Sequence, residues 1–213
     1  MSEFLHIGPA AGPLLLLAHG AGAGMSSPFM ELIAGLLAER NIATARFEFG
    51  YMAARRQTGK RRPPPRAESL MPEYEAALAE ARAAWPVRTI LIGGKSMGGR
   101  VASLIADKAY AAGSCAGLVC LGYPFHPTSK PHSLRTAHLE PLACPALIVQ
   151  GERDPFGNRA EVEGYAVSPA VAFHWAGDGD HDLGPRGGRG YTRKGNLAAA
   201  ADAIAAFARE LED

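Results

Sequence analysis

One serine stands in a segment whose residue types and spacing suit a nucleophile, Gly94-Lys95-Ser96-Met97-Gly98. Its G-x-S-x-G pattern is typical of a sharp turn between a strand and a helix, where the flanking glycines avoid steric clashes. An apolar run at 89–93 precedes this turn and an amphipathic run at 97–111 follows it. The turn would present the Ser96 hydroxyl at a helix N-terminus, where the dipole favours developing negative charge. We predict that Ser96 is the nucleophile of a nucleophile elbow; the alternative is a glycine-rich turn without chemistry.

A serine hydroxyl needs a base to take its proton, and that base needs an acidic side chain to orient it. Proteins with a nucleophile elbow supply these groups in the chain order Ser, Asp or Glu, His. Asp154 and His181 follow two later predicted strands in that order. We predict His181 as general base and then acid, and Asp154 as the group that fixes the imidazole tautomer. Other acidic residues lie too near His181 in sequence or point away from it: Asp178, Asp180, Asp182 and Glu152.

Acyl transfer also needs amide donors aimed at the developing oxyanion. One comes from the residue after the nucleophile, here Met97, and one from the loop after an earlier strand. The segment 18–24 is made almost entirely of glycine and alanine, so its backbone can approach a substrate closely. We predict the backbone amides of Ala21 and Met97 as the oxyanion hole, and Gly20 and Gly22 as substrate-binding residues. His19 is expected to brace this loop by hydrogen bonds.

Two nucleotide-binding patterns are incomplete in this chain. A phosphate-binding loop ending in Gly94-Lys95-Ser96 would need glycine in place of Thr89, and residues 90–92 are strand-like. The pair Gly20 and Gly22 resembles the start of a dinucleotide site, but its third glycine is missing. A dinucleotide site would also leave Asp154 and His181 unexplained.

The elements that must position these residues alternate between short apolar runs and longer amphipathic runs. Such alternation predicts the α/β class, a three-layer α/β/α sandwich with a mostly parallel sheet of six to seven strands. In parallel sheets, ligands bind outside the carboxyl ends of the strands, where all the candidate residues lie. Strands are expected at 14–18, 42–49, 89–93, 116–121, 146–151 and 170–175, with an edge strand at 4–7. Helices are expected at 27–37, 71–85, 97–111, 158–165 and 197–211, with a loop at 50–68.

Composition favours an ordinary globular protein. The chain has 213 residues, which fits one domain spanning 1–213. Its 22 basic and 21 acidic residues give a net charge of +1, which predicts no nucleic-acid or membrane partner. Three cysteines, Cys115, Cys120 and Cys144, form neither a disulfide framework nor a zinc motif. Without a signal-peptide pattern, we expect a cytoplasmic protein, a monomer or homodimer, with no metal.

Two basic clusters interrupt this balance. Six of the 12 residues at 55–66 are basic, and Arg186, Arg189, Arg193 and Lys194 form a second cluster. Both segments follow strands, so they could open on the side of the predicted site. The alternative is that both are solvated loops without a role in binding. In the first case they would favour an anionic substrate.

Four segments carry a family resemblance: H-G-A-G at 19–22, G-G-K-S-M-G at 93–98, G-Y-P-F-H-P at 122–127 and G-E-R-D-P-F-G at 151–157. With them the chain resembles the α/β-hydrolase superfamily over nearly its whole length. It is most similar to the small, lidless group related to dienelactone hydrolases, and within it to the branch with testis-expressed proteins and a chromatin-acetyltransferase-complex subunit. The resemblance implies a minimal fold without a lid domain and an open pocket. From the third segment we predict Tyr123, Phe125 and His126 as further substrate-binding residues.

We therefore predict a serine hydrolase that cleaves a small carboxylic ester or thioester through an acyl-enzyme intermediate. Its partner would be a small-molecule acyl substrate, and the chemistry of such a triad needs no cofactor. The alternative is a non-catalytic binding or scaffold protein on the same fold, because the branch includes members that act within assemblies.

Overall fold

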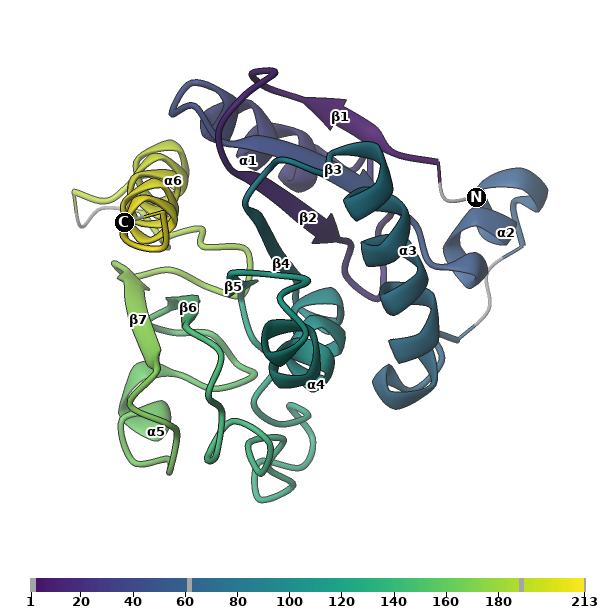
Figure 1. Ribbon diagram of the computed structural model, residues 1–213. Coiled ribbons are helices and arrows are strands. Elements are labelled where there is room, and N and C mark those ends of the chain that lie inside the picture. Colours follow the sequence, from purple (N-terminus) through teal and green to yellow (C-terminus); the bar gives the residue numbers. More distant parts are fainter. Residues whose placement is uncertain (1–2, 61–62, 188–189, 213) are drawn as a thin grey trace.

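A seven-stranded sheet forms the centre of the protein, with the strand order β1-β3-β2-β4-β5-β6-β7 (Figure 1). The computed structural model describes residues 3–60, 63–187 and 190–212. β1 runs antiparallel to β3, and all other neighbouring strands are parallel. The strands are β1 (Leu5–Ile7), β2 (Leu14–Ala18), β3 (Ala43–Phe47), β4 (Ile90–Lys95), β5 (Gly117–Leu121), β6 (Ala146–Gly151) and β7 (Val171–Ala176). This sheet confirms the predicted α/β class and strand number.

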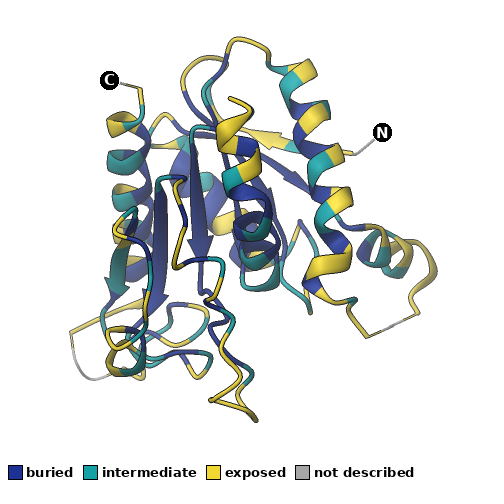
Figure 2. Ribbon diagram, turned by 60° about the horizontal axis from the view of Figure 1, so that its bottom comes forward, coloured by how far each residue is buried: buried dark blue, intermediate teal, exposed yellow. Residues whose placement is uncertain are grey.

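Helices cover both faces of the sheet, which explains why its inner strands are continuous apolar runs (Figure 2). Every residue of β2 through β6 is buried. α1 (Pro28–Ala38) and α6 (Arg193–Glu210) pack on one face, and their apolar residues form one core cluster with the strands. α3 (Met71–Ala84) and α4 (Met97–Ala111) pack on the other face with the second cluster.

The basic segment after β3 differs from its prediction. Instead of a loop throughout 50–68, the chain forms α2 (Gly50–Thr58) and the short 3-10 helix η1 (Ala67–Leu70). The buried Met52 side chain anchors α2, and Gly59, with φ of 69°, ends it in the left-handed conformation. The predicted basic residues Arg61, Arg62 and Arg189 lie outside the described residues.

The sheet has a topological switch point between β2 and β4. From β2 the chain moves to β3 on one side, and it then returns to place β4 on the other side. The loop at 19–24 follows β2, and the turn at Ser96 follows the adjacent strand β4. The chain therefore leaves the carboxyl ends of these two strands in different directions. Open α/β sheets bind their ligands at such a point.

No lid is built over this edge in the described residues. The connection from β5 to β6 contains neither helix nor strand, and α5 (Arg159–Val162) is a single short turn after β6. Among the residues that the structure describes, no helix combines the length and apolar character needed to cross a bilayer.

The two glycines of the elbow are required by close backbone packing. A Cβ atom on Gly98 would lie 2.6 Å from the carbonyl oxygens of both Ala18 and His19. A Cβ atom on Gly94 would lie 2.8 Å from the Ala18 carbonyl oxygen and closer still to the first turn of α4. Because real Cβ atoms do not approach backbone so closely, α4 can begin this near to β2 only with glycine at both positions.

We expect Gly98→Ala to lower the free energy of unfolding by about 1–3 kcal/mol, because the added methyl group overpacks a rigid backbone contact. Urea unfolding measures this change. The matched control is Gly35→Ala in α1, where a Cβ atom meets nothing within 4 Å. That substitution should stabilise the protein by about 0.4–1 kcal/mol. Equal effects of the two substitutions would contradict this account of the elbow.

Candidate active site

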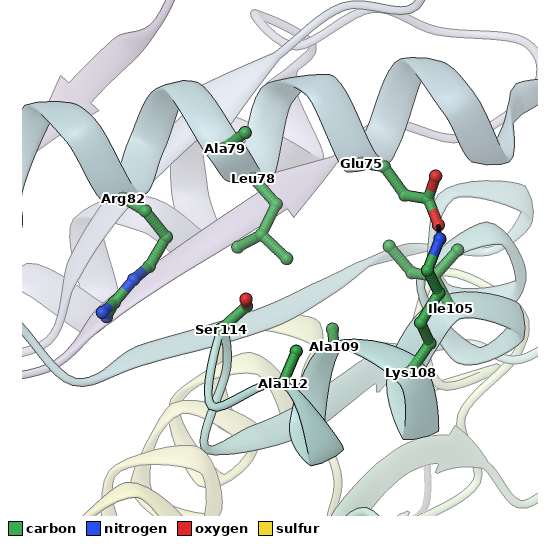
Figure 3. Close-up of a pocket in the computed structure, with 9 residues that line it drawn as sticks. All are labelled: Glu75, Leu78, Ala79, Arg82, Ile105, Lys108, Ala109, Ala112 and Ser114. Atoms are coloured by element: carbon green, nitrogen blue, oxygen red, sulfur yellow. Dashed lines mark hydrogen bonds and ion pairs between the residues drawn. The ribbon is translucent and has the colours of Figure 1, made fainter.

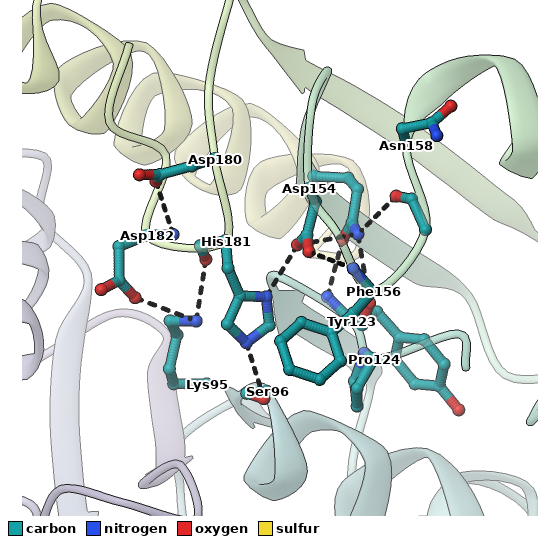
Figure 4. Close-up of polar contacts among 12 residues, drawn as sticks. Lys95, Ser96, Tyr123, Pro124, Asp154, Phe156, Asn158, Asp180, His181 and Asp182 are labelled. Carbon is teal, nitrogen blue, oxygen red and sulfur yellow. Dashed lines mark hydrogen bonds and ion pairs between the residues drawn. The ribbon is translucent and has the colours of Figure 1, made fainter. Parts of the chain in front are cut away.

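Three side chains from different parts of the chain meet at the carboxyl edge of the sheet (Figure 4). Ser96 stands between β4 and α4, Asp154 follows β6, and His181 follows β7. Ser96 Oγ lies 2.8 Å from His181 Nε2, and His181 Nδ1 lies 2.8 Å from Asp154 Oδ2. The structure thus joins the three predicted residues into one hydrogen-bonded chain.

Ser96 occupies a backbone conformation that L-residues rarely adopt, with φ of 50° and ψ of −114°. Hydrogen bonds on both sides of the residue hold this turn. The Ser96 amide donates to the Leu121 carbonyl at 2.9 Å, and the Ser96 carbonyl accepts from the Arg100 amide at 3.0 Å. Strain of this kind persists only where the surrounding structure fixes it, and it is concentrated at functional sites.

Asp154 is fully buried, and hydrogen bonds to both of its carboxylate oxygens orient the side chain. Oδ1 accepts from the Phe156 amide at 2.8 Å, while Oδ2 accepts from Gln150 Nε2 at 3.0 Å and from His181. A buried carboxylate needs such donors because removal from water otherwise penalises its charge. His181 is in turn packed against the Phe156 ring, with 4.4 Å between ring centroids.

Gln150 is a supporting residue that sequence reasoning missed. Its side chain is fully buried at the end of β6 and faces Asp154. Besides Asp154, its amide nitrogen contacts the carbonyl oxygens of Tyr123 and Gly157, and its Oε1 accepts from the Tyr123 amide at 2.7 Å. A glutamine within an otherwise apolar buried strand is the signal, because a buried amide must find partners.

Replacement of Gln150 by leucine should therefore lower the free energy of unfolding by roughly 2–4 kcal/mol, since several buried polar groups lose their partners. Chemical unfolding followed by tryptophan fluorescence checks this. The control is Gln57→Leu on the exposed surface of α2, which should change stability by less than about 0.5 kcal/mol. If Gln150→Leu left the free energy of unfolding unchanged, the Gln150 amide would not be a support of Asp154.

Lys95 is a second residue whose role the sequence did not reveal. Its buried ammonium donates to the His181 carbonyl at 2.8 Å, lies 3.2 Å from Asp182 Oδ1, and stands 5.3 Å from the centre of the Phe29 ring. Burial lowers the pKa of Lys95, and Asp182 partly opposes that shift. Lys95 therefore ties the loop that carries His181 to the strand that carries Ser96 (Figure 4).

The loop after β2 is braced as predicted by His19, which is fully buried. The Phe49 amide donates to His19 Nε2 at 3.1 Å, so the ring proton is on Nδ1 and points to the Gly20 carbonyl at 2.7 Å. Burial lowers the pKa of His19, which keeps it neutral. The Tyr51 hydroxyl also reaches the Ala21 carbonyl, at 3.1 Å.

This bracing sets the direction of one amide. The Gly20 carbonyl and the Ala21 N–H belong to the same planar trans peptide, so they point in opposite directions. Because His19 holds the carbonyl inward, the Ala21 N–H faces away from His19. Within the described part of the chain, neither the Ala21 N–H nor the Met97 N–H has a hydrogen-bond acceptor.

The rival acidic residues are engaged elsewhere. Asp178 pairs with Arg186 at 2.6 Å, and the hydrogen bonds from Arg186 lower the pKa of Asp178 to about 2. Asp180 accepts from backbone amides of its own turn, and Asp182 pairs with Lys95. Glu152 accepts from the Asp178 amide at 2.8 Å, away from His181.

Two clefts open beside Ser96, and Ala21, Ser96 and Phe156 line both of them. The first, which we call the arginine cleft, has a volume of about 700 Å³. Its other lining residues are Pro64, Pro65, Arg66, Ala67, Glu68, Met97, Arg100, Pro124, Ser133, Leu134 and Arg135. The second, the histidine cleft, has a volume of about 510 Å³. It is lined in addition by Gly20, Gly22, Ala23, Ser27, Pro28, Phe29, Met30, Lys95, His181, Asp182 and Arg193.

Only part of the predicted substrate-binding set lines these clefts. Gly20 and Gly22 do so. Tyr123, Phe125 and His126 do not: their side chains are buried, and they are exposed by 0%, 0% and 2%. The physical reason is that the segment turns inward after β5, where the two aromatic rings join the apolar core. We therefore correct the prediction for these three residues, since they support the site from beneath.

A polar cluster below the arginine cleft was also missed. His138 Nε2 lies 2.8 Å from Ser103 Oγ and 3.3 Å from the Tyr123 hydroxyl. Burial and then the nearby Arg100 lower the pKa of His138 from 6.5 to about 4. The half-buried imidazole is therefore neutral at neutral pH.

This shift predicts acid sensitivity. Because the unfolded chain binds a proton at His138 near pH 6.5 and the folded chain only near pH 4, stability falls as pH falls through that window. Between pH 7 and pH 5, His138→Gln should lose about 1 kcal/mol less stability than the wild type, after allowance for solvent screening. Urea unfolding at both pH values measures this difference. The exposed His132→Gln is the control and should follow the wild type.

A further cleft, of about 220 Å³, lies between α3 and α4 and contains none of these residues (Figure 3). Its lining combines Leu78 and Ile105 with the ion pair between Lys108 and Glu75. Within residues 3–60, 63–187 and 190–212, no group of three or more His, Cys, Asp or Glu side chains is placed to hold a metal ion.

Comparison with known proteins agrees with this architecture. The sequence profile of the family described as "Alpha/beta hydrolase domain" matches residues 11–209, so the chain belongs to that family. Its fold is similar to a dienelactone hydrolase from Anabaena variabilis, with a TM-score of 0.69 and 18% identity over 99% of this chain and 97% of that one. An α/β serine hydrolase homologue from Coxiella burnetii gives 0.67 and 20% identity over 96% and 90%. A lidless α/β serine hydrolase from Xanthomonas campestris gives 0.61 and 18% identity over 85% and 86%.

Proposed function

We propose that this protein is a serine hydrolase that cleaves a small carboxylic ester or thioester through an acyl-enzyme intermediate. The observation that carries the proposal is the continuous hydrogen-bonded chain from Ser96 through His181 to the buried Asp154. A structural serine needs neither a strained backbone nor an imidazole whose second nitrogen is fixed by a buried carboxylate. Those features together are what an activated hydroxyl nucleophile requires.

In the first half of the reaction, Ser96 Oγ attacks the acyl carbon while its proton moves to His181 Nε2. Asp154 accepts from Nδ1–H, which fixes the tautomer and stabilises the imidazolium that forms. The Ala21 and Met97 amides are free to donate to the carbonyl oxygen as it becomes an oxyanion. Each such donor is worth about 2.7–4 kcal/mol of barrier stabilisation in enzymes of this type.

The first half ends when His181 gives its proton to the departing alcohol or thiol and the bond between that group and the acyl carbon breaks. In the second half, a water molecule attacks the acyl carbon while His181 takes a proton from it. His181 then returns this proton to Ser96 Oγ as the bond between Ser96 and the acyl carbon breaks, which releases the carboxylic acid and restores the Ser96 hydroxyl. Because every proton is handled by Ser96 and His181, the cycle is complete with the residues of this chain.

The setting that we propose for this activity is the cytoplasm. All three cysteines are free and buried, in keeping with a chain that folds without disulfides in a reducing compartment.

Labelling with a small fluorophosphonate, followed by mass spectrometry, tests the proposal. We expect one adduct, on Ser96, because only an activated serine displaces fluoride from phosphorus. Ser133→Ala should label normally, because Ser133 lines the same cleft but, within the described residues, its hydroxyl has no hydrogen bond to a histidine such as the one that joins Ser96 to His181. Ser96→Ala should remove the adduct, and Ser96→Ala and His181→Ala should each lower ester hydrolysis by at least about 10³-fold.

A folded wild-type protein that neither forms the adduct nor hydrolyses any member of an ester and thioester panel would refute the proposed function. Circular dichroism of each variant separates loss of chemistry from loss of fold.

A further inference from the structure

The arginine cleft carries an excess of positive charge beside the proposed nucleophile. Arg66, Arg100 and Arg135 line it together with a single acidic residue, Glu68. Arg66 enters from the segment before η1, Arg100 from the first turns of α4, and Arg135 from the connection between β5 and β6. Three separate parts of the chain therefore bring guanidinium groups to one cleft that also contains Ser96.

The hydrogen-bonding capacity of these arginines is largely unused. Glu68 pairs with Arg100 through Nη2, but the buried Arg100 Nε has no partner. In the part of the chain that the structure describes, the Arg135 side chain has a single, long hydrogen bond, 3.4 Å from Nη1 to the Pro124 carbonyl. Within the described residues, the guanidinium of Arg66 has no hydrogen-bond or ion-pair partner. A planar guanidinium presents five N–H donors, so this cleft offers many donors and few acceptors.

The electrostatics of the cleft also favour a negatively charged ligand. Burial lowers the pKa of Arg135, and Arg100, a second cation that lines the same cleft, lowers it further by electrostatic repulsion. Arg100 also helps to lower the pKa of His138 nearby. Partly desolvated cations with one shared carboxylate are costly to hold together. An oxyanion bound between them would offset that cost, and guanidinium groups recognise carboxylate and phosphate oxygens in bidentate fashion.

The two clefts divide the substrate between them. His181 must protonate the leaving alcohol or thiol, so that group departs on the side where His181 is exposed, in the histidine cleft. The acyl group then extends into the arginine cleft, which His181 does not line. Pro64, Pro124 and Leu134 give that cleft apolar walls as well as its arginines.

We propose that the acyl group of the substrate ends in an oxyanion, a carboxylate or a phosphate, and that Arg100 and Arg135 bind it in the arginine cleft with Arg66 nearby. The inference rests on the proposed function and specifies its substrate class. Hydrolysis of such a carboxylate-ended ester breaks the bond between acyl carbon and leaving oxygen. The products are a dicarboxylate and an alcohol, with water supplying the new hydroxyl group.

A pair of matched esters tests this preference. The para-nitrophenyl monoester of adipic acid carries a terminal carboxylate, and the corresponding adipamate ester carries a neutral amide of the same shape. We expect the wild type to prefer the acid by at least about tenfold in kcat/KM. That preference should fall as salt is added. Arg100→Met and Arg135→Met should each lower this preference by up to about tenfold, so that the two esters are hydrolysed at similar rates.

Two further variants control for stability and for net charge. Arg66→Met removes an exposed side chain, so it should fold normally and reduce the preference by a smaller factor. Arg82→Met removes the same charge from the distant cleft between α3 and α4 and should keep the wild-type preference. Competition by free adipate and by inorganic phosphate then distinguishes the two oxyanions.

Binding to Ser96→Ala separates failure of this inference from failure of the proposed function. Calorimetry with adipate and adipamate measures recognition without turnover. Tighter binding of adipate that is lost with Arg135→Met supports the arginine site even if the wild type hydrolyses neither ester. Equal binding of the two, or equal turnover of the two esters by an active enzyme, overturns the inference and leaves the proposed hydrolase unaffected.

Discussion

The close approach of α4 to the end of β2 is the constraint on which the site depends. Gly98 lies so near the Ala18 and His19 carbonyls that no side chain fits between them. This contact holds the first turn of α4 under the loop that follows β2, next to Ser96, whose strained backbone is held by hydrogen bonds on both sides. Ala21 and Met97, which follow β2 and Ser96, both line the arginine cleft beside this contact. Every other part of the site is arranged around that contact.

The imidazole is held from several sides, and each support has a different chemistry. Asp154 fixes its tautomer by a buried hydrogen bond, and Gln150 fixes Asp154 in turn. Lys95 holds the His181 backbone through its carbonyl, and Phe156 packs against the ring. A loop residue with such support loses little conformational entropy when it must be aligned with a substrate. The loop after β7 is therefore ordered by contacts that reach back to β4 and β6.

Sequence reasoning recovered the parts of this protein that depend on local patterns. The apolar runs located six strands, with bounds that differ from the structure by a few residues, and the chain order of Ser96, Asp154 and His181 anticipated their meeting. It failed where a long-range contact decides the outcome. The basic residues at 55–56 suggested a loop, whereas burial of Met52 stabilises α2. Tyr123 and Phe125 follow a strand, as the site residues do, but their rings pack in the apolar core.

The supporting polar residues were hidden for a related reason. Gln150 and Lys95 sit at the ends of apolar strands, and only the three-dimensional structure shows which partners their side chains meet. A polar residue inside a buried strand signals that some partner exists, because an unsatisfied buried group is costly. It does not reveal which partner. Identifying those partners needs the register of β4, β5 and β6 and the path of the loops beyond them.

The position of Phe156 has a consequence for how such a protein can change its specificity. Its ring packs against His181 and forms part of the wall of both clefts. A smaller residue there would enlarge the space for both halves of a substrate at once and loosen the imidazole as well. The segments at 64–68 and 133–135 line one cleft only. In the proposed hydrolase, divergence toward new acyl groups would therefore be least constrained in those two segments, whereas a change at Phe156 would alter both clefts together.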